Sequence, residues 1–169
     1  MDDLDARLVH LFADEPRVGV LEASRRLGVA RGTVQARLDR LERSGVVSGW
    51  GPELRPEALD HPVTAFLTLE IQQGRAEHGG HEQVARHLAA IPEVLEAFTI
   101  TGAGDMWARV VARSNADLQR VIDAVLAEPS IVRSSTVIAL ATQIPYRVLP
   151  LLDAVTAVAQ APPTGRVGG

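Results

Sequence analysis

The chain has 169 residues with a net charge of −4, 46% hydrophobic and 22% charged residues, values typical of a folded protein. The absence of cysteine excludes disulfides and thiolate metal sites and fits a reducing cytoplasm. No apolar run approaches the roughly 20 residues of a membrane span, and the acidic start MDDLDARL does not resemble a secretory signal, so we expect a cytoplasmic protein.

The first third of the chain carries three helical patterns. Leucines at helical spacing predict an amphipathic helix over residues 3–13, and a short second helix is predicted over 21–27. Gly28, which suits a left-handed helix terminus, ends the second helix. A third helix follows and closes at Ser44-Gly45. Its expected buried face consists of Val34, Leu38 and Leu41.

Arginine is concentrated on the third helix and just before it. Between Arg25 and Arg43 there are six arginines and two acids, a local charge of +4 in an acidic chain. Two helices joined by a tight glycine turn form a helix-turn-helix, whose second helix enters the major groove. Arginine and glutamine can read base edges, and further arginines can hold phosphates. The residues expected to contact DNA are Arg26, Arg31, Gly32, Thr33, Gln35, Ala36, Arg37, Arg40 and Arg43.

A charged helix face also has a simpler interpretation. The same arginines could be solvated and pair with Glu22, Asp39 and Glu42. The three-helix layout, the Leu-Gly-Val turn and a possible wing favour DNA binding. The wing is predicted from VVSGWGPEL, residues 46–54, as a small β-hairpin completing a winged helix-turn-helix domain over 1–51. RPEALDHP follows with two prolines and predicts a linker over 52–62.

From residue 63 the hydrophobic period changes from helical to alternating. Strands are expected at 63–71, 94–101, 106–112 and 132–142, and helices at 82–91 and 116–126. The order βαββαβ is the ferredoxin-like arrangement, so the predicted fold class is α+β with this second domain over 63–147. A further amphipathic helix is expected at 150–159, within a C-terminal segment of 148–160. The Pro- and Gly-rich tail 161–169 is expected to be disordered.

The stretch Thr101-Gly102-Ala103-Gly104-Asp105 lies between two predicted strands. It can be a simple hairpin loop in which the glycines supply positive φ. The same glycines would also let backbone N–H groups approach a carboxylate, while Asp105 faced the α-amino group of a free amino acid. Spacing alone leaves both interpretations open. Further candidates for the wall of such a site are Thr136 and Ile138 on the last strand.

The LD opening, the RRLG turn, the RLDRLERSGVV segment and the βαββαβ region together resemble the leucine-responsive/asparagine-responsive (Lrp/AsnC) transcriptional regulators over residues 2–147. The resemblance implies a DNA-binding head and a sensing domain that binds an amino acid at the 101–105 loop, at contacts between subunits. It also implies a dimer formed through the sheets, with tetramers or octamers built from dimers. Ala30 departs from the pattern, because such helices commonly start with Ser, and the helix at 150–159 extends past the family's usual end.

Enzymatic and metal-dependent functions find little support in the motifs. His78, His81 and His87 invite a metal site, but two of them fall in a Gly-rich loop and no cysteine accompanies them. No nucleophile elbow, P-loop or dinucleotide fingerprint is present. We therefore expect no catalytic residue, metal or cofactor, and expect as partners double-stranded DNA, further copies of the chain and a small effector. The alternative function is a small-molecule sensor that assembles without binding DNA.

Overall fold

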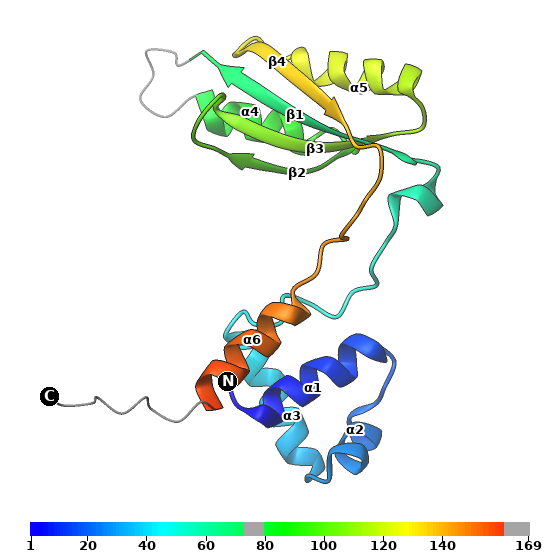
Figure 1. Cartoon of the computed structure of the whole chain (residues 1–169), viewed down its shortest axis with the longest axis vertical. Helices are drawn as coiled ribbons and strands as arrows, with labels where there is room; N and C mark the ends of the chain where they lie inside the picture. The colour runs from blue at the N-terminus through cyan, green and yellow to red at the C-terminus, as the bar shows by residue number, and fades with distance from the viewer. Residues whose placement is uncertain (73–79, 161–169) are drawn as a thin grey trace, which may run out of the picture. The chain divides into compact units, whose positions relative to one another are not determined.

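The computed structural model describes residues 1–72 and 80–160, so the expected tail 161–169 lies outside the described residues (Figure 1). Two compact units are formed. Within the described residues, the helical unit consists of residues 1–52 and 144–160, and the α/β unit consists of residues 53–72 and 80–143. In the described ranges, no helix is both long enough and apolar enough to cross a membrane.

The helical unit contains four helices. They are α1 (Asp3–Asp14), α2 (Val20–Leu27), α3 (Arg31–Arg43) and α6 (Leu149–Gln160). A capping box begins α1, because the Asp2 carboxylate accepts from the Asp5 N–H at 3.0 Å and the Asp5 carboxylate accepts from the Asp2 N–H at 2.9 Å. Gly28, at φ 69°, ends α2 in the left-handed conformation. The three helices expected in the first third are thus confirmed.

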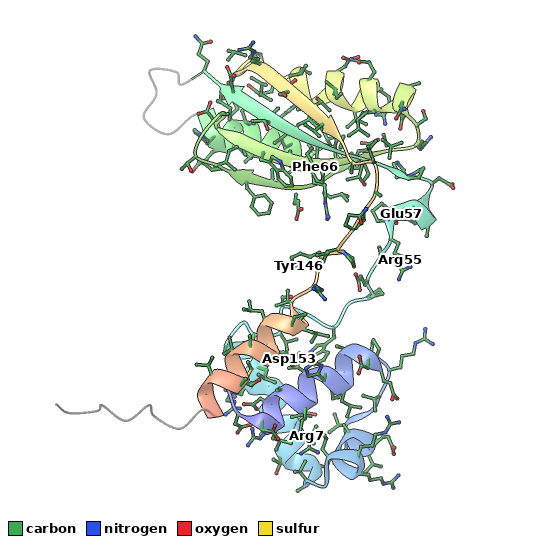
Figure 2. The ribbon with its side chains drawn as sticks, viewed as in Figure 1. Arg7, Arg55, Glu57, Phe66, Tyr146 and Asp153 are labelled. Atoms are coloured by element: carbon green, nitrogen blue, oxygen red, sulfur yellow. The ribbon has the colours of Figure 1, made fainter. Side chains whose placement is uncertain are left out.

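The core of the helical unit is small and draws on both ends of the chain. Buried side chains from α1, α2 and α3 meet at its centre, and they are Leu8, Ala23, Val34 and Leu38. Helix α6 packs against α1, where Leu152 and Thr156 are buried. Asp153 of α6 lies toward α1 (Figure 2), and its Oδ1 is 2.5 Å from Nε2 of His10. The helix expected at 150–159 therefore exists and is part of this packing.

The β-hairpin expected over 46–54 is not formed, so the prediction of a wing is wrong. No strand occurs between residues 44 and 62, where the only regular element is the short 3-10 helix Pro56–Leu59. Two strands of two or three residues around glycines bury too little to hold an isolated ribbon in water. Trp50 instead packs edge-on against Phe12, with ring centroids 5.2 Å apart, and its indole N–H donates to the Glu42 carboxylate.

The α/β unit has the expected βαββαβ order. Its elements are β1 (Val63–Ile71), α4 (Gly80–Ala89), β2 (Val94–Thr99), β3 (Met106–Ala112), α5 (Asn115–Leu126) and β4 (Ile131–Ile138). The strands pair antiparallel in the order β2-β3-β1-β4, the ferredoxin-like sheet. Both helices cover one face of this sheet (Figure 1). The last strand ends at Ile138, four residues short of the expected end.

The two faces of the sheet differ in what covers them. Alternate residues of β1 are buried beneath α4 and α5, and they are Ala65, Leu67, Leu69 and Ile71. On the opposite face Phe66 stacks on Trp107 with ring centroids 5.0 Å apart, and Phe98 lies 5.9 Å from the same indole. Phe98 and Val137 remain exposed there. Within the described part of the α/β unit, this face therefore carries an aromatic cluster that no helix covers, beside the ion pair between Arg109 and Glu96 at 3.2 Å.

Candidate functional site

Helix α3 turns one face into the core and the other to solvent. Its buried residues are Val34, Leu38 and Leu41, as the periodicity predicted. Almost every residue expected at DNA lies on the exposed side. The exposed residues are Arg31, Gly32, Thr33, Gln35, Ala36, Arg40 and Arg43, together with Arg26 on α2. Arg37 is the exception, since its side chain is only 24% exposed.

Arg37 and Arg40 are held by the start of α1. Nη1 of Arg37 donates to Oδ1 of Asp2 at 2.6 Å and to Oδ1 of Asp5 at 2.8 Å. Nη2 of Arg40 donates to the two carboxylate oxygens of Asp5 at 2.5 and 2.6 Å. The hydrogen bond from Arg37 lowers the pKa of Asp2 to about 2. Two acids outside the arginine-rich window therefore offset part of its charge.

Other polar contacts hold side chains around α3. Nε2 of Gln35 donates to the Asp39 carboxylate at 2.8 Å, and Nε of Arg43 donates to the Asp39 carbonyl at 3.1 Å. Arg26 pairs with Glu15 at 2.5 Å and with Glu22 at 3.0 Å, and Glu15 raises its pKa. The simpler interpretation, arginines paired with neighbouring acids, thus describes Arg26 well. It does not describe Arg31, which makes no ion pair with any described residue.

The N-terminus of α3 is open to solvent. Ala30 occupies the N-cap with extended backbone, φ −63° and ψ 145°, and no side chain caps the helix. The N–H groups of the first turn therefore lack a side-chain acceptor, and only that of Thr33 donates to a backbone carbonyl, that of Ala30 at 3.0 Å, among the described residues. Such a terminus attracts anions, because its free N–H groups and the helix dipole both favour negative charge.

The 101–105 loop is fastened to β1 by its last two residues. The Asp105 N–H donates to the Leu69 carbonyl at 2.9 Å, and Oδ2 of Asp105 accepts from the Ile71 N–H at 2.7 Å. A Cβ placed on Gly104 would lie 2.5 Å from Cγ2 of Thr68, so only glycine fits there without displacement. Gly102 has φ +114°, which favours glycine. Thr101, Gly102 and Ala103 are exposed.

Thr136 and Ile138, the two β4 residues expected at the wall of the effector site, lie away from this loop in the structure. Thr136 pairs with Leu67 and Ile138 pairs with Ala65, whereas the loop is fastened at Leu69. The two positions are therefore about 7 and 13 Å further along β1, at roughly 3.3 Å per residue. They also lie across β1 from the loop, because β4 and β3 flank opposite edges of that strand. The β4 residue level with Leu69 is Ser134, which only the register could reveal.

The histidines are not gathered into a metal-binding group within residues 1–72 and 80–160. Nε2 of His87 donates to the carbonyl of Ala124 at 2.8 Å, which ties α4 to α5. His81 is half-buried at the start of α4. His78 lies outside the described residues.

A helix-turn-helix with an exposed basic recognition helix, joined to a ferredoxin-like unit, defines a DNA-binding transcriptional regulator with a separate second domain. Comparison with protein families agrees. The AsnC-type helix-turn-helix domain matches residues 1–42, and the Lrp/AsnC ligand binding domain matches residues 64–149, more than half of the chain. The chain belongs to the Lrp/AsnC family of transcriptional regulators.

Similar proteins cover nearly the whole chain. The HTH-type transcriptional regulator FL11 of Pyrococcus horikoshii is 26% identical over 151 residues, 89% of this chain and 97% of that one. Escherichia coli AsnC has the same fold, with a TM-score of 0.79 at 23% identity over 89% of this chain and 99% of its own. The feast or famine regulatory protein of Mycobacterium tuberculosis, solved with L-methionine, has a TM-score of 0.74 at 27% identity, covering 86% and 96%.

Proposed function

We propose that this regulator is a homo-oligomer whose α3 reads operator DNA and whose DNA binding responds to a free amino acid. The observation that carries the proposal is the division of α3, with an apolar face buried and its basic face exposed. In this proposal residues 1–51 form the DNA-binding domain and residues 52–62 form a linker. Residues 63–147 form the domain that binds the effector and mediates oligomerisation. The protein acts in the cytoplasm, without a catalytic residue, metal or cofactor.

The exposed residues of α3 divide by the DNA groups that they suit. Thr33, Gln35 and Ala36 lie near the N-terminal end of the helix, where base edges are usually read. Gln35 would exchange its hydrogen bond to Asp39 for an adenine edge. Three of the exposed arginines hold phosphates, which set the register without specifying sequence. They are Arg26, Arg31 and Arg43.

The DNA-binding proposal is tested with duplexes selected from a pool of randomised sequence. The affinity of the wild-type protein for the selected duplex should fall steeply with salt. The logarithm of the association constant should decrease with the logarithm of the salt concentration with a slope of about 0.9 per phosphate contact. Arg31→Ala should reduce that slope by about 1. Arg86→Ala, on the exposed side of α4, is the matched control and should leave it unchanged. Salt-independent binding, or no binding at all, would favour the alternative of a sensor that does not bind DNA.

The effector is proposed to be a zwitterionic amino acid held by the 101–105 loop. Oδ2 of Asp105 is occupied by the Ile71 N–H, but Oδ1 has no donor among the described residues and could accept from an α-ammonium group. Exposed backbone at Thr101, Gly102 and Ala103 could face the carboxylate. Thr136 and Ile138 contribute only if they come from a neighbouring subunit or the ligand is long, because they lie further along the sheet.

A thermal-shift screen of the twenty amino acids tests the effector site. A ligand at 100 times its Kd should add about 2.7 kcal/mol to the free energy of unfolding. Asp105→Asn keeps an oxygen for the Ile71 N–H while it removes the charge, so it should abolish the shift without opening the loop. Asp123→Asn on α5 is the control for loss of one charge. A full shift in Asp105→Asn would show that the loop is only a turn.

Assembly is proposed to use the uncovered face of the sheet. The cluster of Phe66, Phe98 and Trp107 is an apolar surface that a second sheet would bury. A two-fold dimer would place two α3 helices on successive major grooves, with half-sites about 10 base pairs or a multiple apart. Effector binding would then change head spacing through residues 52–62, with a coupling of about 1–3 kcal/mol. Sedimentation of Phe98→Glu should show monomers where the wild type shows dimers.

A further inference from the structure

Asp5 is a buried carboxylate at the start of a surface helix. Its side chain is 1% exposed, although the residue sits in the first turn of α1. A carboxylate is costly to bury unless charged partners and hydrogen bonds replace its water. Asp5 must therefore be paired in the folded protein.

The partners of this carboxylate come mainly from α3. Oδ1 of Asp5 accepts from Arg37 at 2.8 Å and from Arg40 at 2.5 Å. Oδ2 accepts from Arg40 at 2.6 Å and from the Asp2 N–H at 2.9 Å. Both oxygens thus have two donors. Release of either arginine would leave a buried charge undersatisfied, which confines both guanidinium groups to one pose.

The two arginines differ in what they leave free. The side chain of Arg37 is 24% exposed and also binds Asp2, so it is mainly an anchor. The side chain of Arg40 is 53% exposed, and Asp5 engages only its Nη2. Its Nε and Nη1 donors have no acceptor within residues 1–72 and 80–160. One end of this guanidinium is therefore fixed while the rest faces solvent on the exposed side of α3.

We infer that Asp5 is a positioning residue for DNA recognition, which holds the Arg40 guanidinium ready to donate from Nε and Nη1 to an acceptor on the duplex. The inference rests on the proposed function, in which α3 lies on DNA. A fixed arginine loses less side-chain freedom on binding than a free one, so Asp5 raises affinity without touching DNA. The acceptor is a base edge if the gain is specific to the selected duplex, and a phosphate if scrambled duplexes share it.

Charge removal near DNA has an opposing effect that the test must separate. Loss of any acid on α1 lowers repulsion toward phosphates and would by itself tighten binding. Asp3→Asn supplies the matched control. Asp3 is also in the first turn of α1, but its carboxylate is exposed and pairs at 3.9 Å with Arg7 of the same helix. Asp3→Asn and Asp5→Asn therefore remove the same charge, and only the second releases Arg40.

The experiment measures Kd for a duplex selected from a randomised pool and for a scrambled duplex of the same composition. Asp5→Asn should weaken binding by up to about tenfold relative to Asp3→Asn, which corresponds to the cost of ordering one long side chain on binding. In an Arg40→Ala background, Asp5→Asn should bind DNA like Asp3→Asn, because the effect of Asp5 beyond its charge passes through Arg40. Equal effects in both backgrounds would show a merely structural role and overturn the inference.

A second measurement covers the outcome that Asp5→Asn does not fold. Guanidinium NMR signals of Arg40 in the wild-type protein, assigned with Arg40→Lys, should show restricted rotation about Nε–Cζ without DNA. Signals averaged by free rotation would overturn the inference. If the wild type binds no duplex at low salt, the proposed function fails while the Arg40 signals still test its positioning. If the wild type binds and Asp5→Asn behaves like Asp3→Asn, only the positioning inference fails.

Discussion

The two units of the protein are held together in different ways. In the α/β unit, a sheet and two helices enclose one continuous cluster of buried apolar side chains from every strand but β2. The buried cluster of the helical unit has only Leu8, Ala23, Val34 and Leu38. It is supplemented by α6 from the far end of the chain and by the buried charge of Asp5. A small DNA-binding unit without a wing thus depends on contacts that are distant in sequence.

Each unit contains one of the two tryptophans, so the comparison can be measured unit by unit. Trp50 packs on Phe12 in the helical unit, and Trp107 stacks on Phe66 in the α/β unit. Trp107→Phe leaves a fluorescence signal from the helical unit, and Trp50→Phe leaves one from the α/β unit. The predictions below use these two backgrounds.

The largest effect is expected at the α6 contact. Leu152 is 8% exposed against α1, whereas Leu151 beside it is 64% exposed. Leu152→Ala should lower the free energy of unfolding of the helical unit by about 2–3 kcal/mol, because it leaves a cavity. Urea unfolding followed by Trp50 measures the change, and Leu151→Ala is the matched control. Equal losses in both variants, or a loss seen only by Trp107, would contradict the dependence on α6.

The α/β unit should respond to crowding at the loop. Gly104→Ala places a methyl group where Cγ2 of Thr68 and the Leu69 carbonyl already lie. It should destabilise this unit by about 1–2 kcal/mol through overpacking, as reported by Trp107. Thr68→Ser removes the clashing methyl group and should restore part of the loss. No recovery in the double variant would argue that the loop is not packed against β1 in this way.

A gain is expected at the start of α3. Ala30 offers no side chain to the free N–H groups of the first turn. Ala30→Ser should stabilise the helical unit by about 0.5–1 kcal/mol, because its hydroxyl can accept from one of them. The melting temperature followed by Trp50 fluorescence should rise, while the melting temperature followed by Trp107 fluorescence stays unchanged. Ala36→Ser, on the exposed middle of the same helix, serves as the control and should bring no gain.

The smallest effect is expected from acid. Hydrogen bonds from Arg37 and Arg120 lower the pKa of Asp2 and of Asp117 to about 2. Their folded-state pKa values lie below the ordinary 3.8, so each carboxylate stabilises its unit above pH 4 and loses this contribution as the pH falls toward 2. Asp2→Asn should flatten the pH dependence of the free energy of unfolding reported by Trp50 alone. Asp117→Asn should do the same for the free energy of unfolding reported by Trp107. An unchanged pH profile in either variant would contradict the assignment.

Local pattern was enough for most of the fold and for the exposed face of α3. Apolar spacing of 3.6 or 2 residues marks the buried face of a helix or strand wherever packing occurs, so Val34, Leu38 and the strand β1 could be predicted. The wing could not, because a hairpin signal at 46–54 says nothing about whether a third strand or helix will support it. The distance of Ile138 from the 101–105 loop along the sheet could not be predicted either, because strand order does not reveal register.

The sequence by itself determined which segments are helices and strands and which side of α3 is basic, since these follow from short-range periodicity and composition. Only the tertiary structure decided that Asp5 is buried and that Arg37 and Arg40, more than thirty residues away, supply its partners. It also decided that α6 completes the helical unit and that Gly104 lies on Thr68. These outcomes depend on how separate elements cross, and a pattern within one element carries no information about that crossing.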